Sequence, residues 1–267
     1  MIKPESSFDL TNKVAIITGG ASGLGFDMAC ELASAGCDLV VTSRFPEKLE
    51  SSVGHLHSLG AEVLPISMDQ CHYEEVKSMA EQAFQWKGHI DILINNAGGG
   101  SGKSEGDLFK RDPNDIVNLI TTNLTGALYC CKAVGDYMTR QKSGKIINIG
   151  SIAGIVGRDR RMYHDNNKSE QPIDYAAAKA GVIGMTRDLA AYLAPFGISV
   201  NCISPGGFQG DSLPQGFVDA YNKATAMGRM GKMGVDIKGT ALFLSSPASD
   251  YMTGQNIVLD GGFTIFK

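Results

Sequence analysis

The chain has 267 residues, of which 43% are hydrophobic, so it can bury a large core within one domain. A formal net charge of −4 and an isoelectric point near 5.7 argue against a general binder of nucleic acid or of acidic membranes. No apolar stretch approaches the roughly 18 residues of a membrane span, and the first nine residues contain no apolar signal core, so we expect a cytoplasmic protein.

Apolar, β-branched runs alternate with stretches of helical spacing, which predicts βαβ units and a parallel sheet. We expect about seven strands, centred on Ile16, Val40, Val63, Ile92, Ile147, Val200 and Val258. We expect helices over residues 24–35, 46–59, 73–87, 113–140, 174–194 and 235–245. No linker or repeat interrupts this pattern. Residues 1–267 are therefore predicted to form a single doubly wound α/β domain with helices on both faces of the sheet.

Glycines cluster where the first predicted strand meets the first predicted helix. The pattern Thr-Gly-x-x-x-Gly-x-Gly places Gly19, Gly23 and Gly25 around Ser22 and Leu24. Such glycines allow a tight turn and let the backbone approach a pyrophosphate, which the unpaired N–H groups of a helix N-terminus favour. Taken alone, however, the spacing is not the general GxGxxG fingerprint, and it favours a glycine-rich turn that binds no ligand.

A second glycine-rich segment, Gly102-Lys103-Ser104, ends like the phosphate-binding loop of a nucleoside triphosphatase. That motif requires glycine five positions before Gly102, where this chain has Ala97. We therefore predict a flexible loop near the cofactor instead.

Tyr175 and Lys179 lie four positions apart in a predicted helix that is otherwise rich in alanine. Side chains at this spacing share one helix face, so a phenol would lie beside an ammonium group. A fixed positive charge favours the phenolate and lowers the phenol pKa from about 10 toward neutral pH. The pair is weak evidence alone, because it arises by chance in many helices, but it gains weight beside a dinucleotide-binding turn.

Together these features resemble the short-chain dehydrogenase/reductase family over nearly the whole chain. Five matches in order carry the resemblance: the turn from Thr18 to Gly25, Asn95-Asn96-Ala97-Gly98 after a strand, Asn123 in a helix, Ser151 after the strand Lys145–Ile149, and the Tyr175/Lys179 pair. The resemblance implies a Rossmann fold that binds a nicotinamide dinucleotide.

The resemblance also implies a catalytic tetrad. Tyr175 would be the general acid in carbonyl reduction and the general base in alcohol oxidation. Ser151 would donate a hydrogen bond to the substrate oxygen. Lys179 would lower the pKa of Tyr175 and bind the nicotinamide ribose, and Asn123 would hold a water that links Lys179 to solvent. Considered alone, Ser151 is more often a turn residue at a strand end, and Asn123 is more often a capping or core amide.

The family usually separates its serine and tyrosine by about a dozen residues, whereas Ser151 and Tyr175 are 24 apart. Tyr163 lies twelve positions past Ser151, but the residue four past Tyr163 is Asn167, not lysine. We therefore assign the role to Tyr175, and interpret about 158–171 as an insertion near the active site. The insertion has four basic and three acidic residues, so a net charge of +1 gives little support for anion binding.

Family alignment places Ser43 where NAD-dependent members carry an acidic residue, and Arg44 directly after it. Because guanidinium matches phosphate geometry, we predict a preference for NADP(H), with NAD(H) as the alternative; Arg44 could equally lie on a solvated turn. The resemblance adds Asp69 at the adenine, Asn96 near the adenine ribose, and Gly206 beside the nicotinamide. Gly210 stands where the family often has a nicotinamide-binding threonine.

We therefore predict an oxidoreductase that transfers a hydride between NADP(H) and a carbonyl or secondary alcohol, with sugar acids or polyols as the expected substrates. Residues 208–233 are expected to form a substrate lid. Two alternatives stay open: a non-catalytic dinucleotide sensor, and an epimerase or dehydratase on the same fold. The branch that the chain resembles contains gluconate 5-dehydrogenases and 3-oxoacyl carrier-protein reductases.

The helix over 174–194 is apolar nearly all round, and the C-terminal Phe263-Thr264-Ile265-Phe266 is apolar as well. A helix on a sheet needs only one apolar stripe, so we predict a homotetramer; coverage by the helix over 114–140 and the insertion is the alternative. Neither a metal site nor a disulfide is expected, because the five histidines are scattered and the six cysteines have no CxxC spacing.

Overall fold

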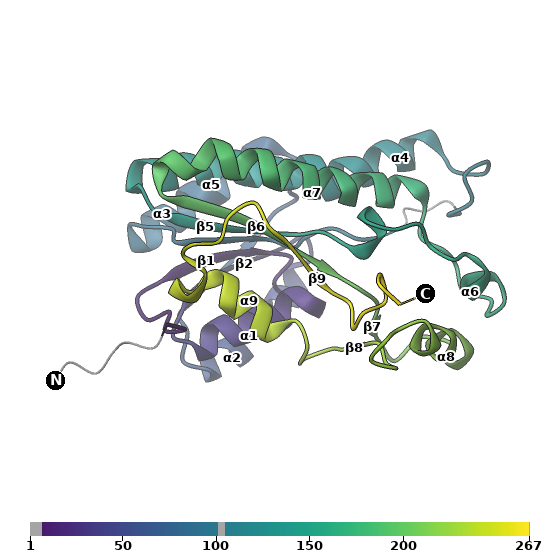
Figure 1. Ribbon diagram of the computed structural model, residues 1–267. Helices are drawn as coiled ribbons and strands as arrows, with labels where there is room; N and C mark the ends of the chain where they lie inside the picture. The colour runs from purple at the N-terminus through teal and green to yellow at the C-terminus, as the bar shows by residue number, and fades with distance from the viewer. Residues whose placement is uncertain (1–6, 101–104, 267) are drawn as a thin grey trace.

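The computed structural model describes residues 7–100 and 105–266, and it has a sheet between two layers of helices (Figure 1). In these residues the main sheet has seven parallel strands in the order β3-β2-β1-β4-β5-β6-β9. Their bounds are β1 Val14–Thr18, β2 Asp38–Ser43, β3 Val63–Ser67, β4 Ile92–Asn95, β5 Gly144–Ile149, β6 Ile198–Pro205 and β9 Asn256–Leu259. The predicted fold is confirmed, and every predicted strand centre lies in one of these strands.

The central strands are rich in Val, Ile and Leu because a parallel sheet covered on both faces buries both sets of side chains. All five residues of β1 are buried, as are all four of β4. The chain runs outward from β1 to β3 and then returns to the other side of β1 with β4. This reversal leaves a crevice at the carboxyl ends of β1 and β4, where doubly wound sheets bind ligands.

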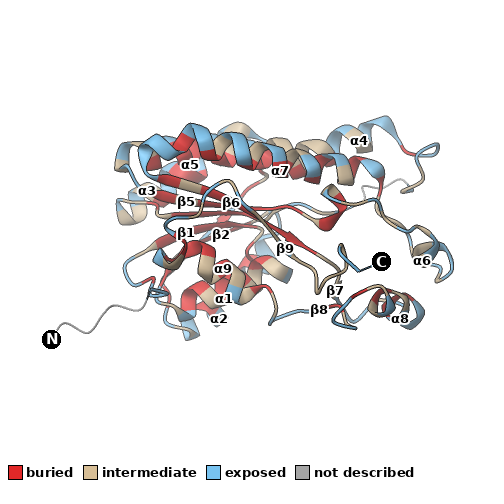
Figure 2. Ribbon diagram, in the orientation of Figure 1, coloured by how far each residue is buried: buried red, intermediate tan, exposed pale blue. Residues whose placement is uncertain are grey.

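Helices α1 (Gly23–Ser34), α2 (Pro46–Ser58) and α9 (Lys238–Ser245) cover one face of the sheet. The opposite face carries α3 (Tyr73–Lys87), α4 (Pro113–Ile120), α5 (Gly126–Gln141) and α7 (Ile173–Leu193). Figure 2 shows that the buried side of each helix layer faces the strands. No helix in the described parts of the chain is both long and apolar enough to cross a membrane.

The single helix predicted over 113–140 is instead three consecutive segments. It begins at Pro113, where Asp112 caps the first turn by accepting from the backbone N–H of Asn114 at 2.8 Å. The segment Thr121–Thr125 is a π-helix between α4 and α5. Widened turns of this kind are frequent at functional sites, and this one contains the predicted site residue Asn123.

The helix predicted over 235–245 begins only at Lys238, because Asp236 is held in a turn. Its carboxylate accepts from the backbone N–H of Lys232 at 2.7 Å and pairs with Arg229 at 2.5 Å. The remaining short helical turns are Ile152–Gly154, Ala194–Phe196 and Pro247–Ser249.

Two segments contain structure that the sequence did not predict. The segment 158–171, which the sequence indicated only as an insertion, includes α6 (Arg161–His164). The segment 208–233 contains α8 (Gln215–Lys223) and a small sheet of β7 (Phe208–Gln209) and β8 (Gly231–Lys232). Both short helices lie at the end of the molecule near β7 (Figure 1). Gly102-Lys103-Ser104 lies outside the described residues.

Candidate active site

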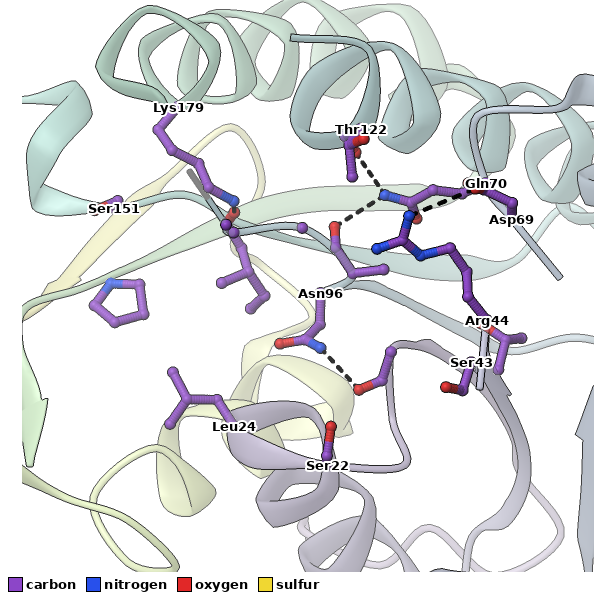
Figure 3. Close-up of a pocket in the computed structure, with 18 of the residues that line it drawn as sticks. Ser22, Leu24, Ser43, Arg44, Asp69, Gln70, Asn96, Thr122, Ser151 and Lys179 are labelled. Carbon is purple, nitrogen blue, oxygen red and sulfur yellow. Dashed lines mark hydrogen bonds and ion pairs between the residues drawn. The ribbon is translucent and has the colours of Figure 1, made fainter. Parts of the chain in front are cut away.

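A cavity of about 480 Å³ lies at the carboxyl ends of the central strands, at the predicted crevice. One end is lined by residues that follow β2 and β3, including Arg44 and Asp69. The other end is lined by Ser151 and Lys179, which Figure 3 shows, and by Tyr175. Between them lie the start of α1 and the glycines after β4. An elongated pocket with a helix N-terminus at its middle has the shape that a dinucleotide requires.

The glycine turn is held by a network centred on Thr18 and Asn96. The Thr18 hydroxyl, which is fully buried, accepts from the backbone N–H groups of Asn96 at 3.1 Å and Ala97 at 3.0 Å. The Asn96 amide donates to the backbone carbonyls of Thr18 at 3.0 Å and Gly19 at 3.2 Å. A side chain at Gly25 would lie 2.3 Å from the Gly19 carbonyl oxygen. This position therefore requires glycine for packing within the turn itself.

The first turn of α1 has the donors that a pyrophosphate needs. Ser22 is the N-cap residue, yet its side chain makes no capping hydrogen bond to the helix. Ser22 and Leu24 both line the pocket, and Gly19 and Gly23 adopt φ of 64° and 57°, which favours glycine. Uncapped N–H groups at a helix N-terminus favour an anion. The residues present thus fit the diphosphate of a dinucleotide.

The end of the pocket that is expected to bind the adenine, called the adenine end below, carries an ion pair that the sequence did not predict. Arg44 and Asp69 lie across the pocket with 3.6 Å between guanidinium nitrogen and carboxylate oxygen. Burial raises the pKa of Asp69, but hydrogen bonds with the backbone and side chain of Cys71 and the charge of Arg44 together outweigh that effect, so the pKa lies below its usual value. Ser43 also lines the pocket, and its hydroxyl accepts from the backbone N–H of Phe45 at 3.0 Å.

At the opposite end, Tyr175 and Lys179 are both buried, with 9% and 4% of their surfaces exposed. The Lys179 ammonium lies 5.8 Å from the centre of the Tyr175 ring and donates to the backbone carbonyl of Ile149 at 2.8 Å. Ser151 caps the turn after β5 by accepting from the backbone N–H of Ala153 at 3.1 Å. A side chain at Gly154 would lie 2.6 Å from the backbone nitrogen of Ala180, so this glycine lets α7 approach the serine turn.

The charges at this end differ from the expectation that Lys179 lowers the pKa of Tyr175. Burial raises the pKa of Tyr175, opposed by hydrogen bonding with Ser151, by the charge of Arg158 and by hydrogen bonding with Gln171. Burial also lowers the pKa of Lys179 to about 8. Desolvation therefore dominates both groups, and the cation that acts most on Tyr175 is Arg158.

Asn123 connects the π-helical turn to the glycines after β4. Its side-chain oxygen accepts from the backbone N–H of Gly99 at 2.7 Å, and its amide donates to Leu119 at 3.0 Å and to the Gly99 carbonyl at 3.3 Å. A side chain at Gly98 would lie 2.6 Å from the Asn123 oxygen and 3.7 Å from the Lys179 ammonium nitrogen. The predicted tetrad residues Asn123 and Lys179 are thus neighbours across Gly98.

Tyr163 lies elsewhere, in an aromatic cluster with α8. Its ring centre is 5.0 Å from that of Phe217, and it packs with Tyr221 and Phe263 rather than lining the pocket. Burial raises its pKa, and the charge of Arg158 opposes that shift.

Of the residues after β6, Gly206 lines the pocket and donates to the backbone carbonyl of Leu259 at 2.9 Å. Gly210, where the family often has threonine, is not among the residues that line it.

Sequence reasoning missed several side chains that line the pocket, among them Phe45, Lys48, Gln70 and Thr122. Gln70 bridges two elements, since its amide donates to the carbonyls of Ala97 at 2.9 Å and Thr122 at 2.6 Å. The position of Lys48, four residues after Arg44, was the available signal for a second basic group at the adenine end.

Comparison with known proteins places this geometry in a family. The short chain dehydrogenase model matches residues 13–216. A 3-oxoacyl-acyl-carrier-protein reductase from Chlamydia pneumoniae is 34% identical, covering 96% of this chain and 98% of that protein. A 2-dehydro-3-deoxy-D-gluconate 5-dehydrogenase from Escherichia coli is 34% identical, covering 97% and 98%.

Among solved structures, a gluconate 5-dehydrogenase from Burkholderia cenocepacia in complex with NADP and tartrate is 31% identical, with a TM-score of 0.86 over 97% of both chains. The similarity therefore extends over nearly the whole fold. The chain therefore belongs to the short-chain dehydrogenase/reductase family, whose members are oxidoreductases that act on CH–OH and carbonyl groups.

Proposed function

We propose that the protein is an NADP(H)-preferring enzyme that interconverts a carbonyl compound and a secondary alcohol. The observation that carries the proposal is the meeting of Ser151, Tyr175 and Lys179 at one end of a pocket whose other end carries Arg44. When bound, the nicotinamide supplies the hydride to the substrate carbon, or removes it in the oxidative direction.

Tyr175 is the group that transfers the proton. In reduction its phenol donates the proton to the substrate oxygen, and in oxidation the phenolate accepts it back. Ser151 donates a hydrogen bond to the same oxygen and stabilises its developing negative charge. Lys179 and Asn123 complete the proposed tetrad: Lys179 binds the ribose, and Asn123 holds the loop at Gly99 and relays protons to solvent through a water.

The proposed preference for NADP(H) rests on the basic adenine end. Arg44 follows β2 where a carboxylate would select NAD, and Lys48 adds a second positive charge in the same part of the pocket. Asp69 holds Arg44 from one side, which limits the conformations of its guanidinium. The NADP complex of the related gluconate 5-dehydrogenase is consistent with this preference.

We further propose that residues 158–171 and 208–233 together border the substrate, as an insertion and a lid. Support comes from their shared aromatic cluster, in which Met162 and Tyr163 pack against Phe217 and Tyr221. Sugar acids and polyols are the proposed substrate classes, because the related dehydrogenases named above act on gluconate derivatives.

We also propose a homotetramer. The outer face of α7 carries the exposed small residues Ala177, Ala180, Gly184 and Ala191, which would let another helix approach closely. The same face also carries the charged Arg187 and Asp188, and it ends at the largely exposed Tyr192. Beyond the edge strand β9, Ile265 and Phe266 are 82% and 53% exposed. Apolar surface of this extent is typical of subunit contacts. Light scattering after size exclusion tests the proposal, and a mass near 28.4 kDa at micromolar concentration would overturn it.

The main experiment is a reduction assay with a panel of carbonyl compounds. The reaction is monitored by the loss of nicotinamide absorbance, once with NADPH and once with NADH. We expect turnover with NADPH and a higher kcat/KM for NADPH than for NADH. Failure to reduce any member, and to oxidise any matching alcohol, with either cofactor would contradict the proposed activity.

A further inference from the structure

One arginine beside the proposed active site carries a charge that no described carboxylate balances. Arg158 begins the insertion, and its guanidinium closes the loop by donating to the Gln171 side chain at 3.2 Å and to the Pro172 carbonyl at 3.0 Å. Both acceptors are neutral. Tyr175 follows Pro172 by three residues, so the guanidinium is fixed beside the start of α7.

Three neighbouring arginines are already paired with carboxylates. Arg160 forms an ion pair with Glu170, and Arg161 pairs with Asp159 at 2.7 Å. The buried Asp174, which precedes Tyr175, pairs with Arg111 at 2.8 Å. Lys168 has no carboxylate partner in the described residues either, but its ammonium lies over the Phe217 ring, 5.3 Å from the ring centre. Arg158 is therefore the unpaired cation of the insertion that acts on Tyr175.

The guanidinium also acts directly on the phenol of Tyr175. Its positive charge opposes the upward shift that burial gives the pKa of Tyr175, and Gln171, which Arg158 contacts, does the same through hydrogen bonding. Arg158 is itself half-buried, and a partly desolvated cation with only neutral partners is costly unless an anion joins it. Gln171 interacts with both the guanidinium and the phenol, which places these two groups close together at the start of α7.

We propose that Arg158 binds a carboxylate of the substrate, and that the enzyme therefore acts on oxo acids and hydroxy acids rather than on neutral ketones or polyols. This inference rests on the proposed function and chooses between its two substrate classes. The planar guanidinium is suited to a carboxylate because it can donate two parallel hydrogen bonds. Arg158 would then be a specificity-determining residue, separate from the residues that transfer the proton.

The competing explanation is that Arg158 only closes the insertion loop. Arg158→Gln separates the two, because glutamine keeps N–H donors for Gln171 and Pro172 but removes the charge. Arg158→Lys keeps the charge without the planar donor pair. Arg161→Gln is the matched control, since it changes the same residue type in the same insertion at an exposed side chain paired with Asp159.

The kinetic experiment uses straight-chain oxo acids and their methyl esters, each measured with NADPH and the wild-type and variant enzymes. We expect the wild type to prefer each accepted acid over its ester. Arg158→Gln should lower kcat/KM for the acid by roughly 10- to 100-fold, the range for a charge-assisted hydrogen bond, and leave the ester within about threefold. Arg158→Lys should retain part of the preference, and Arg161→Gln all of it.

Equal use of acid and ester by the wild type would overturn the inference while supporting the proposed function. An equal loss on both substrates in Arg158→Gln would also overturn it, in favour of loop closure. If no oxo compound is reduced at all, the proposed function fails instead. Calorimetric titration of the NADP⁺-loaded enzyme with 3-hydroxybutanoate and its methyl ester then still decides the inference, because binding needs no turnover and equal affinities would contradict it.

Discussion

The adenine end of the pocket rests on buried strands, whereas the end beyond Tyr175 rests on two short helices, α6 and α8. At the adenine end, the turn after β1 is fixed by the buried hydroxyl of Thr18 and the amide of Asn96, which connect it to β4. Beyond Tyr175, the insertion is fixed by surface ion pairs and by a small aromatic cluster around Phe217. The first end is thus specified by the sheet, and the second by side chains that are distant in sequence.

The two ends therefore differ in how freely their sequences can vary between related enzymes. A turn held by the sheet tolerates few substitutions, which suits a site that binds the same cofactor throughout a family. Short helices joined by loops can change length and charge without disturbing the core. The residues that choose a substrate are therefore expected at the second end, and the residues that bind cofactor at the first.

The largest effect is expected when the proton-transferring group itself is removed, rather than a residue at either end of the pocket. Tyr175→Phe should lose at least ~100-fold in kcat, because the phenol that transfers the proton is gone, while cofactor affinity measured by fluorescence titration stays nearly unchanged. Tyr163→Phe is the matched control, since its ring packs against Phe217 away from the pocket, and it should keep most activity. A reversal of the two results would assign the proton transfer to the insertion.

The sequence predicted what depends on local pattern. The strands and the glycine turn follow from buried apolar runs and from the rule that strand ends meet at one edge of the sheet. The grouping of Ser151, Tyr175 and Lys179 was expected from the resemblance to the family. The pattern of Tyr175 and Lys179 also distinguished this tyrosine from Tyr163, which the structure places in the aromatic cluster.

What the sequence did not predict depends on long-range contacts and on burial. Helix α8 is stabilised by Tyr163 and Phe263, each more than forty positions from Phe217. The π-helical turn at Asn123 spans only five residues inside a longer helical run, so its wider turn leaves no recognisable period in the sequence. The direction of the Tyr175 pKa shift was wrong, because helical spacing places Lys179 nearby but says nothing of the desolvation that both groups undergo.

A second prediction tests how rigidly the adenine end is specified. Thr18→Val has nearly the same shape but removes the acceptor for the N–H groups of Asn96 and Ala97. The free energy of unfolding should fall by about 2 kcal/mol, as for buried donors left without partners. Thr42→Val is the control. The Thr42 side chain lies on the neighbouring strand and makes no hydrogen bond in the described residues, so the loss of unfolding free energy should be smaller. Equal losses in chemical denaturation would contradict this account.

A third prediction concerns the cost of burying Lys179. Its pKa is about 8 in the folded chain and 10.5 when free, so below pH 8 the folded state bears the full cost of a buried charge. Between about 8 and 10.5 the unfolded state binds more protons, and the stability of the wild type should rise with pH. Lys179→Met should be more stable at pH 7 by ~2 kcal/mol, since removing that cost outweighs the lost bond to Ile149.

The measurement is the free energy of unfolding from denaturant titration at pH 7, 9 and 10.5. The difference between the two proteins should shrink as pH rises, although the variant should lose most activity at every pH. A variant that is less stable at pH 7 would show that the hydrogen bond to Ile149 matters more than the charge.

The smallest expected effect concerns cofactor choice at the rigid end. Arg44→Gln should raise the KM for NADPH roughly tenfold, near the lower limit for a charge-assisted contact, because this guanidinium is 54% exposed and screened by solvent. NADH kinetics should stay almost flat, since NADH lacks the 2′-phosphate. The effect on NADPH should weaken as salt is raised, which a loss of packing would not do. Arg140→Gln, on the outer surface of α5, provides the control for loss of an exposed arginine. If the wild type prefers NADH, or if Arg44→Gln weakens both cofactors alike, then Arg44 supports Asp69 at the adenine instead of selecting the phosphate.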